Sequence, residues 1–593
     1  MIFGKHINKY YLKYLHWIVL GVVTLFLVDY FQLQLPELYR MIIDGIDKGE
    51  VIVNEGEAPI PFDMVFVLDR ICLPLLIIAV VLILGRFLWR ICFFGSAIKV
   101  ETDIRREMFS VGKNLSQEFY QKNKVGNLMS LFTNDLETVN ECFGDGALML
   151  FDALLLGGLA IIKMAGMNWL LTLLALIPMV FMLLASTLIS KYMMHKWQLR
   201  QEAFSALSDF SQENFSGIAV IKAFVKEAKE LWAFRKLNKD NERANVEFTR
   251  ASVTLRILVT LFVESVICII LGYGGYLVYS GVFSGGQLVE FIAYFTSVVW
   301  PIMAISNLVE MSSRGRASLK RIGTFLDATP TVKDRAGAET LTELRGDIEF
   351  RGLTFAYPDS SVNALENVSF KINAGENVGI IGKTGSGKTT LVDLILRTYN
   401  VPDGTLFIDG RDVNTVTIRS LREHLAYVPQ DNFLFSDTIA ANIAFASDDK
   451  REELVERSAT LADVHDNIKD FHDGYNTVLG ERGVTVSGGQ KQRISIARAL
   501  MKEAEILILD DSVSAVDTGT EEVIIRNLRE NRQGRTTILI AHRVTTVERM
   551  DKIIFVEDGK ILAAGTHDEL LRSCREYRET VELQRLEDEG GDR

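Results

Sequence analysis

Glycines and a lysine in the last third of the chain have the spacing of a phosphate-binding loop. Eight residues fit the pattern G-x-x-x-x-G-K-[ST], namely Gly382, Lys383, Thr384, Gly385, Ser386, Gly387, Lys388 and Thr389, and Thr390 follows directly. In such a loop, backbone N–H groups cradle phosphates, the lysine neutralises the β- and γ-phosphates, and the hydroxyl after it binds Mg²⁺. Taken alone, the run could also be a chance glycine-rich turn. We expect a nucleotide site in which Lys388 binds phosphate and Thr389 binds Mg²⁺.

Two more runs follow in a fixed order. The first is Ser487, Gly488, Gly489 and Gln490. A serine hydroxyl, glycine N–H groups and the start of a predicted helix together make an anion site. The second is an apolar strand, residues 506–509, which ends in the acidic pair Asp510 and Asp511. Asp510 is expected to hold Mg²⁺, usually through water. With the phosphate-binding loop, these runs resemble the nucleotide-binding domain of the ATP-binding cassette (ABC) family.

The resemblance implies roles for further residues. Tyr357 matches the aromatic residue that stacks on adenine, although a Tyr-Pro pair alone would indicate only a turn. Gln430 matches the glutamine that reaches Mg²⁺ and senses the γ-phosphate. His542 matches the switch histidine, although a lone histidine at a strand end is more often structural. The Ser487–Gln490 run would complete the nucleotide site of a second such domain, so the resemblance implies a dimer.

Asp511 departs from the family pattern. Catalytic sites of the family carry glutamate there, which polarises the attacking water, and aspartate is about 1.5 Å shorter; a 1 Å misplacement can cost on the order of 10²-fold in rate. One interpretation is that Asp511 works with a shifted backbone. The other is a weakened site in a heterodimer, whose partner supplies glutamate and has an altered signature run. We favour the second, with Asp511, His542 and Gln430 as the catalytic group.

The secondary structure around these residues indicates two kinds of domain. A short apolar strand, residues 378–381, leads into the phosphate-binding loop, and a helix follows. Upstream, six apolar stretches have the length that a helix needs to cross hydrocarbon. They are Leu15–Leu33, Leu68–Trp89, Ala147–Ala165, Trp169–Ile189, Val253–Tyr279 and Leu288–Val309. We predict an all-α bundle of six transmembrane helices that extend into the cytoplasm, followed by an α/β P-loop domain.

Basic residues set the orientation. Lys5, Lys9 and Lys13 precede the first stretch, and the segments after the second and fourth stretches are also basic. The positive-inside rule places the N-terminus and the nucleotide-binding domain in the cytoplasm. The expected location is the cytoplasmic (inner) membrane.

Two inner segments extend the resemblance to six-helix ABC exporters. The runs 126–135 and 216–224 look like the inner loops that dock on the ATPase domains, so the helices are expected to turn back at 118–126 and 213–217. The resulting boundaries are 1–326 for the transmembrane domain, 327–346 for the linker and 347–593 for the nucleotide-binding domain.

The composition limits the kinds of molecule that the protein is expected to bind. A net charge of −12 argues against nucleic acid, which binds basic surfaces. The five cysteines are scattered without metal-ligand spacing and are interpreted as reduced thiols. The expected partners are a second half-transporter, the lipid bilayer and a hydrophobic small-molecule, lipid or peptide substrate, with ATP and Mg²⁺ as cofactors.

Ionisable residues inside membrane spans are functional candidates. Asp152 and Glu264 fall near the middle of their stretches and could attract cationic amphiphiles, or could pair with other helices. ATP-driven export by half of a dimeric ABC transporter is the preferred function. The alternatives are a homodimeric lipid or peptide exporter, an ATP-holding regulatory subunit, and an importer, which the fusion of both domains in one chain disfavours.

Overall fold

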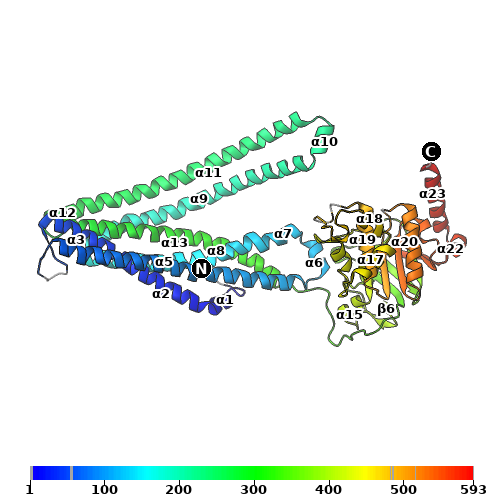
Figure 1. Ribbon diagram of the computed structural model, residues 1–593. Helices are drawn as coiled ribbons and strands as arrows, with labels where there is room; N and C mark the ends of the chain where they lie inside the picture. Colours follow the sequence, from blue (N-terminus) through cyan, green and yellow to red (C-terminus); the bar gives the residue numbers. More distant parts are fainter. Residues whose placement is uncertain (1–3, 54–57, 481–482, 484–485, 515, 592–593) are drawn as a thin grey trace. The chain divides into compact units, whose positions relative to one another are not determined.

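The computed structural model describes residues 4–53, 58–480, 483, 486–514 and 516–591 (Figure 1). The chain forms two compact units, each described here by itself. The first combines Met1–Asn114 with Lys124–Ala328, and the second combines Leu115–Asn123 with Thr329–Arg593.

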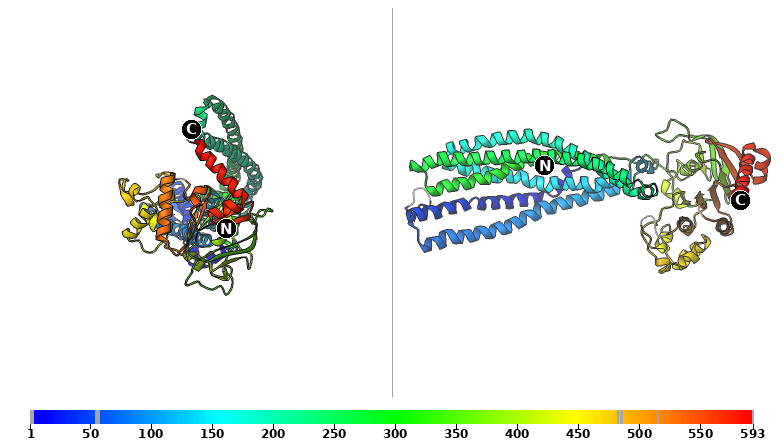
Figure 2. Two further views of the ribbon diagram at one scale, coloured as in Figure 1. Left: turned by 90° about the vertical axis from the view of Figure 1, so that its right-hand side faces the viewer. Right: turned by 90° about the horizontal axis from the view of Figure 1, so that it is seen from above.

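The first unit is helical, as predicted (Figures 1 and 2). Its helices are α1 (Asn8–Lys13), α2 (Leu15–Gln32), α3 (Leu35–Lys48), α4 (Met64–Phe66), α5 (Leu73–Gly112), α7 (Val125–Ser130), α8 (Leu136–Met167), α9 (Trp169–Ser216), α10 (Ile218–Ala223), α11 (Glu227–Ile269), α12 (Gly275–Tyr279) and α13 (Gly285–Leu326). π-helical turns lie at Val67–Cys72, Leu131–Asp135 and Ile270–Gly274, and β1 (Glu50–Val51) pairs with β2 (Ile60–Pro61).

Five of the described helical segments are long and apolar enough to cross a membrane. They are Leu15–Lys48, Met64–Gly112, Val125–Met167, Glu227–Tyr279 and Gly285–Leu326. The remaining expected span corresponds to a shorter apolar segment, Trp169–Ala185, at the start of α9. Five of the six predicted spans are therefore matched by length and composition, and the count of six stays a prediction.

The long helices turn back where the sequence indicated. After α5 the chain forms the short helix α6 (Gln117–Lys122), and after α9 it forms α10 before α11 begins at Glu227. The helices α9 and α11 make a long hairpin with α10 at its tip (Figure 1). Helix α6 belongs to the second compact unit.

The second unit contains two sheets. The larger has the order β12-β11-β5-β10-β9-β8, parallel except for β12 at its edge. Its strands are β5 (Asn377–Ile381), β8 (Leu425–Val428), β9 (Ile506–Asp510), β10 (Thr536–Ala541), β11 (Lys552–Glu557) and β12 (Lys560–Gly565). The smaller sheet is antiparallel, with the order β4-β3-β6-β7, and is made of β3 (Ile348–Phe355), β4 (Leu365–Ile372), β6 (Leu406–Ile408) and β7 (Arg411–Asp412).

Helices surround these sheets. They are α14 (Lys388–Ile395), α15 (Ile418–Glu423), α16 (Ile439–Ala444), α17 (Glu452–Leu461), α18 (His465–Lys469), α19 (Gly488–Met501), α20 (Thr518–Asn531), α21 (Val544–Val547), α22 (His567–Ser573) and α23 (Arg575–Gly591), with a 3₁₀ turn at Gly474–Asn476.

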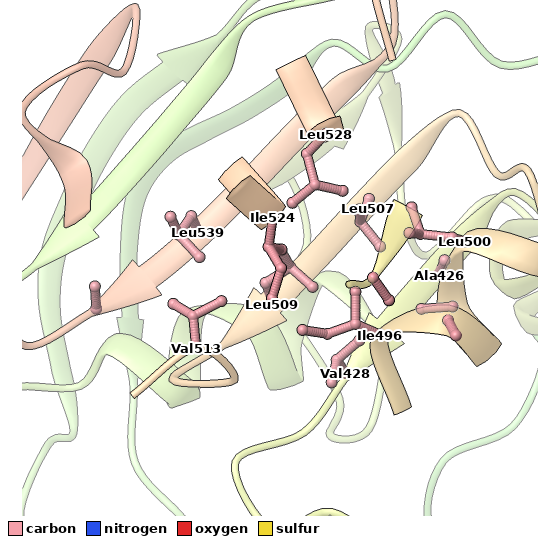
Figure 3. Close-up of a cluster of buried hydrophobic side chains, with 14 of the residues drawn as sticks. Ala426, Val428, Ile496, Leu500, Leu507, Leu509, Val513, Ile524, Leu528 and Leu539 are labelled. Atoms are coloured by element: carbon pink, nitrogen blue, oxygen red, sulfur yellow. The ribbon is translucent and has the colours of Figure 1, made fainter. Parts of the chain in front are cut away.

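Central strands of the larger sheet are buried on both faces, which explains their continuous apolar runs. On one face, Leu507, Leu509 and Leu539 pack against residues of α19 and α20 (Figure 3). On the other, Ile506, Ile508 and Ile538 share a core with Leu391 and Val392 of α14 and with the smaller sheet. Full burial of each such side chain contributes about 1.5–3 kcal/mol. This packing holds the strand ends in fixed positions.

Candidate nucleotide-binding site

Four predicted motifs meet at one edge of the larger sheet. The strands β5, β10, β9 and β8 are parallel neighbours, so their carboxyl ends lie side by side. These ends lead into Gly382, His542, Asp510 with Asp511, and Gln430, respectively. Ligands of open α/β sheets bind at such carboxyl ends. Parallel pairing therefore brings together residues that are up to 160 positions apart in the chain.

Glycines give the phosphate-binding loop its conformation. Gly385 and Gly387 have φ values of 82° and 99°, in the left-handed region that disfavours other residues. At Gly382, an added Cβ would lie 2.0 Å from the carbonyl oxygen of Val556. The loop then enters α14, whose N-terminal N–H groups form an anion site.

Lys388 lies inside this loop. Its Nζ donates to the carbonyl oxygens of Gly382 at 2.8 Å and Lys383 at 2.9 Å, and the residue is only 6% exposed. Burial lowers the pKa of Lys388, and Asp510 and Asp511 oppose that shift. The ammonium group is thus held at the centre of the loop, close to two carboxylates.

Asp510 is a buried carboxylate beside two hydroxyls. The Thr389 hydroxyl donates to Oδ1 at 3.3 Å, and the Tyr427 hydroxyl lies 3.5 Å from Oδ2. Burial raises the pKa of Asp510, while the Thr389 hydroxyl opposes the shift. A carboxylate with a neighbouring hydroxyl supplies the hard oxygen ligands that Mg²⁺ prefers, so these residues fit that ion.

Asp511 meets the other two residues predicted to be catalytic. Gln430 Nε2 donates to Asp511 Oδ2 at 3.3 Å, and His542 Nε2 lies 3.9 Å from the same oxygen. The backbone of Asp511 has a φ of 48°, a conformation in which aspartate is more common than glutamate. Its N–H donates to the carbonyl oxygen of Ile540 at 3.0 Å, which ties the ends of β9 and β10 together.

Tyr357 lies beside the same loop. Its hydroxyl is 2.9 Å from the Thr390 hydroxyl, and its ring packs edge-on against Phe355 and Tyr399, with centroids 5.3 and 5.1 Å apart. Half-burial raises the pKa of the Tyr357 phenol. An aromatic ring is therefore adjacent to the phosphate-binding loop, and its stacking on adenine stays a prediction.

The Ser487–Gln490 run begins helix α19. Ser487 Oγ accepts from the N–H of Gln490 at 3.2 Å, and Gln490 Oε1 accepts from the N–H of Ser487 at 3.0 Å. This reciprocal capping box uses the glutamine side chain internally. In the described part of the chain, no hydrogen bond or ion pair joins this run to residues 382–390.

Sequence reasoning missed several contacts near the site. The Tyr427 hydroxyl reaches the Asp510 carboxylate. The only sequence feature that could have indicated this contact is the position of Tyr427 next to the Gln430 motif. Helix α6 is tied to the P-loop unit by Lys122, which lies 3.1 Å from Asp359, and by Gln121, which accepts a hydrogen bond from Tyr399. Gln584 of α23 binds the loop that carries His542, and nothing in the sequence near residue 584 indicates it.

The two candidate substrate residues lie on different helices of the first unit. Asp152 on α8 is half-buried, and its Oδ2 accepts from Trp300 Nε1 on α13 at 2.8 Å. Glu264 is exposed on α11. Within the described residues, no hydrogen bond or ion pair connects the two carboxylates. The structure thus pairs Asp152 with a tryptophan of another helix.

A helical unit with membrane-length segments and a P-loop unit with this site define a membrane-bound nucleotide-binding protein. The family model described as "ABC transporter" matches residues 365–514, and the one described as "ABC transporter transmembrane region" matches residues 6–302. The chain belongs to the ABC transporter family.

Similar proteins cover nearly the whole chain. The probable multidrug resistance ABC transporter ATP-binding/permease protein YheI of Bacillus subtilis is 36% identical over 99% of this chain and 98% of its own length. The multidrug resistance-like ATP-binding protein MdlA of Escherichia coli is also 36% identical, over 96% and 94%. A bacterial Atm1-family ABC exporter, solved with ATP bound, matches with a TM-score of 0.74 and 27% identity over 98% of both chains.

Proposed function

We propose that this chain is one half of a dimeric ABC transporter that exports hydrophobic or amphipathic compounds across the cytoplasmic membrane, driven by ATP. The observation that carries the proposal is the convergence of the P-loop, Asp510, Asp511, Gln430 and His542 at one sheet edge. Full-length relatives named for multidrug resistance support export rather than import. In this proposal residues 1–326 form the transmembrane domain, 327–346 the linker and 347–593 the nucleotide-binding domain.

Each site residue has a proposed role. Residues 382–390 bind the phosphates of ATP, Thr389, Gln430 and Asp510 hold Mg²⁺, and Tyr357 stacks on adenine. When bound, Mg²⁺ neutralises charge that develops on the phosphates. Gln430 and His542 contact the γ-phosphate region, and both lie close to Asp511.

The Ser487–Gln490 run is proposed to complete the nucleotide site of the partner domain. At the start of the 14-residue helix α19, the Ser487 hydroxyl and the N–H groups of Gly488 and Gly489 can donate to an anion. The run has no bond to its own P-loop in the described residues, which supports a role toward another subunit. One P-loop unit and one such run per chain make two complete sites in a dimer.

Asp511 supports a heterodimer in which this chain's own P-loop site is slow. The Asp511 carboxylate is held by Gln430 at 3.3 Å, on a side chain one methylene shorter than glutamate. The partner subunit would then supply glutamate at the matching position, and this chain would complete the faster site with Ser487–Gln490. A homodimeric exporter of lipids or peptides is the second candidate, because a lipid A-core flippase of Syntrophus aciditrophicus is 34% identical over 88% of the chain.

The test is ATP-dependent dye uptake into inside-out vesicles that contain this chain alone or with the product of the neighbouring reading frame. The expected result is uptake only with both subunits, lost in the Lys388→Ala and Ser487→Ala variants. Full ATP hydrolysis and uptake by the chain alone would show a homodimer instead. ATP binding without uptake in either preparation would favour a regulatory, ATP-holding subunit.

Asp152 is the stronger candidate for contact with cationic amphiphiles, because its carboxylate and the Trp300 ring offer a cation both charge and a π-face. The Asp152→Asn variant is expected to reduce export of cationic dyes while export of neutral compounds persists. Unchanged cationic dye export by the double variant Asp152→Asn, Glu264→Asn would refute the proposal for both residues.

A further inference from the structure

Gln584, on the C-terminal helix α23, holds the loop of His542 at two points. Its Nε2 donates to the carbonyl oxygen of His542, and its Oε1 accepts from the N–H of Val544, each at 2.7 Å. One amide group thus satisfies an acceptor and a donor two residues apart, as a neighbouring strand would. Both bonds are shorter than the usual N–H···O distance of about 2.9 Å, and they join segments about 40 residues apart.

The clamp is built on a buried helix face. Tyr577, Val581 and Gln584 are spaced four and three residues apart, so they share one side of α23. Tyr577 is fully buried against Phe555 of β11, with ring centroids 5.7 Å apart, and its hydroxyl lies 2.8 Å from His567 Nδ1. Val581 is only 5% exposed. Gln584 is therefore placed by the domain core, and its side chain is not a free surface group.

Within the described residues, Gln584 is the partner of both the Val544 N–H and the His542 carbonyl oxygen. Val544 begins α21, and the residue before it, Arg543, makes no side-chain cap. The first N–H groups of a helix have no partner within it, so Gln584 serves as the missing cap from another helix. Only His542 and Arg543 separate this point from the end of β10. The backbone of His542 is consequently fixed on both sides, while its Nε2 stays 3.9 Å from Asp511 Oδ2.

Lys383, the second residue of the phosphate-binding loop, forms an ion pair with Glu557 at 2.6 Å. The Glu557 carboxylate raises the pKa of Lys383, and Glu579 of α23 adds a smaller electrostatic contribution in the same direction.

We propose that Gln584 is a positioning residue for His542, and that α23 thereby sets how long this chain's site retains ATP. The inference rests on the proposed contact between His542 and the γ-phosphate region. If Gln584 releases the loop, His542 loses its fixed distance from Asp511, and the bound nucleotide leaves faster. Gln584 acts through the His542 loop and not by contact with the nucleotide.

The variant Gln584→Met tests the clamp, because methionine has a similar length and lacks both hydrogen-bonding groups. Gln584→Glu keeps the acceptor for Val544 but places a carboxylate against the His542 carbonyl oxygen. Glu582→Ala, an exposed position on the same helix, is the matched control. All are made in the full-length chain, in nanodiscs, together with any subunit that co-purifies.

The first measurement is hydrogen–deuterium exchange of the peptide spanning residues 541–547. The expected result for Gln584→Met is about tenfold faster exchange of this peptide, the effect of losing one or two ordinary hydrogen bonds, with no change for Glu582→Ala. Unchanged exchange would overturn the proposal. Faster exchange spread over β5, β9 and β10, with a thermal midpoint lowered by more than about 5 °C, would also overturn it, because Gln584 would then be structural.

The second measurement follows release of 8-azido-ATP from this chain, by photolabelling at increasing times after dilution. About tenfold faster release is expected for both Gln584 variants, with initial labelling unchanged because the P-loop is intact. Wild-type retention in both variants would refute the effect on ATP. The exchange measurement needs no nucleotide, partner or transport, so it succeeds or fails independently of the proposed export function.

Discussion

Replacing Asp511 with glutamate is expected to accelerate hydrolysis at this chain's own site. The Asp511 carboxylate is 3.3 Å from Gln430 and 3.9 Å from His542, so it already lies among the residues predicted to be catalytic. One added methylene extends the carboxylate by about 1.5 Å, and a misplacement of about 1 Å costs on the order of 10²-fold in rate. A 10²-fold gain corresponds to about 2.7 kcal/mol of activation free energy.

The backbone opposes part of this gain. Residue 511 has a φ of 48°, in a region where aspartate is enriched and longer side chains are less common. An incompatible conformation in this region costs about 1–3 kcal/mol, which lowers the stability of the domain or shifts the carboxylate. We therefore expect a net acceleration of about tenfold for Asp511→Glu, below the gain of about 10²-fold without backbone strain.

A single-turnover assay isolates this site from that of the partner. The full-length chain is loaded with radiolabelled 8-azido-ATP, crosslinked at successive times, and the bound ADP fraction is measured on this chain alone. Asp511→Asn, which keeps the shape but removes the charge, is expected to be slower than wild type. If Asp511→Glu gains less than about twofold, with unchanged ATP loading and thermal midpoint, then the missing methylene does not limit the site and the reasoning is wrong.

The remaining predictions concern the P-loop and its domain. Lys388→Ala is expected to abolish photolabelling by 8-azido-ATP without changing the fold. The loop carbonyls hold the buried ammonium group at the centre of the loop, and the variant removes this charge. Labelling within twofold of wild type would contradict this prediction. Burial, with a contribution from Asp510, raises the pKa of Asp393 on α14 to about 6. Ionisation of Asp393 therefore destabilises the fold, and the free energy of unfolding should fall as pH rises from about 4 to about 6. Asp393→Asn should therefore raise the thermal midpoint at pH 7.5 and lose this advantage near pH 4, and an equal effect at both pH values would refute the assignment. Leu509→Ala removes a fully buried side chain that faces α20 (Figure 3), and urea denaturation should show a loss of about 2–5 kcal/mol, whereas a loss below 1 kcal/mol would show that the core relaxes around the cavity.

Local sequence patterns were sufficient to predict the two kinds of domain. The glycine spacing predicted the loop before α14, and the apolar runs predicted the strands that end at Ile381 and Asp510. Long apolar stretches predicted the membrane-length helices, because about 20 apolar residues in a row have few other uses. The turn at α6 was also predicted, although its membership of the P-loop unit was not.

The sequence alone could not reveal which side chains meet across the fold. The hydroxyl of Tyr427 near Asp510 depends on the register of β8 beside β9. The capping box within Ser487–Gln490 uses the Gln490 side chain, and the sequence motif did not indicate this bond. Packing sets the distance in space between such residues, and no local sequence pattern encodes that distance.

The chemistry available to this protein can be read from its residues: a phosphate-binding loop, an acidic pair with aspartate where the family has glutamate, and apolar helices for a membrane. How these groups are assembled follows from strand pairing and helix packing. Parallel pairing of β5, β10, β9 and β8 places four distant motifs at one edge, and a C-terminal helix fixes the His542 loop through Gln584. Residue types and short spacings are local properties, whereas strand order and helix packing arise because apolar surface is buried throughout the domain.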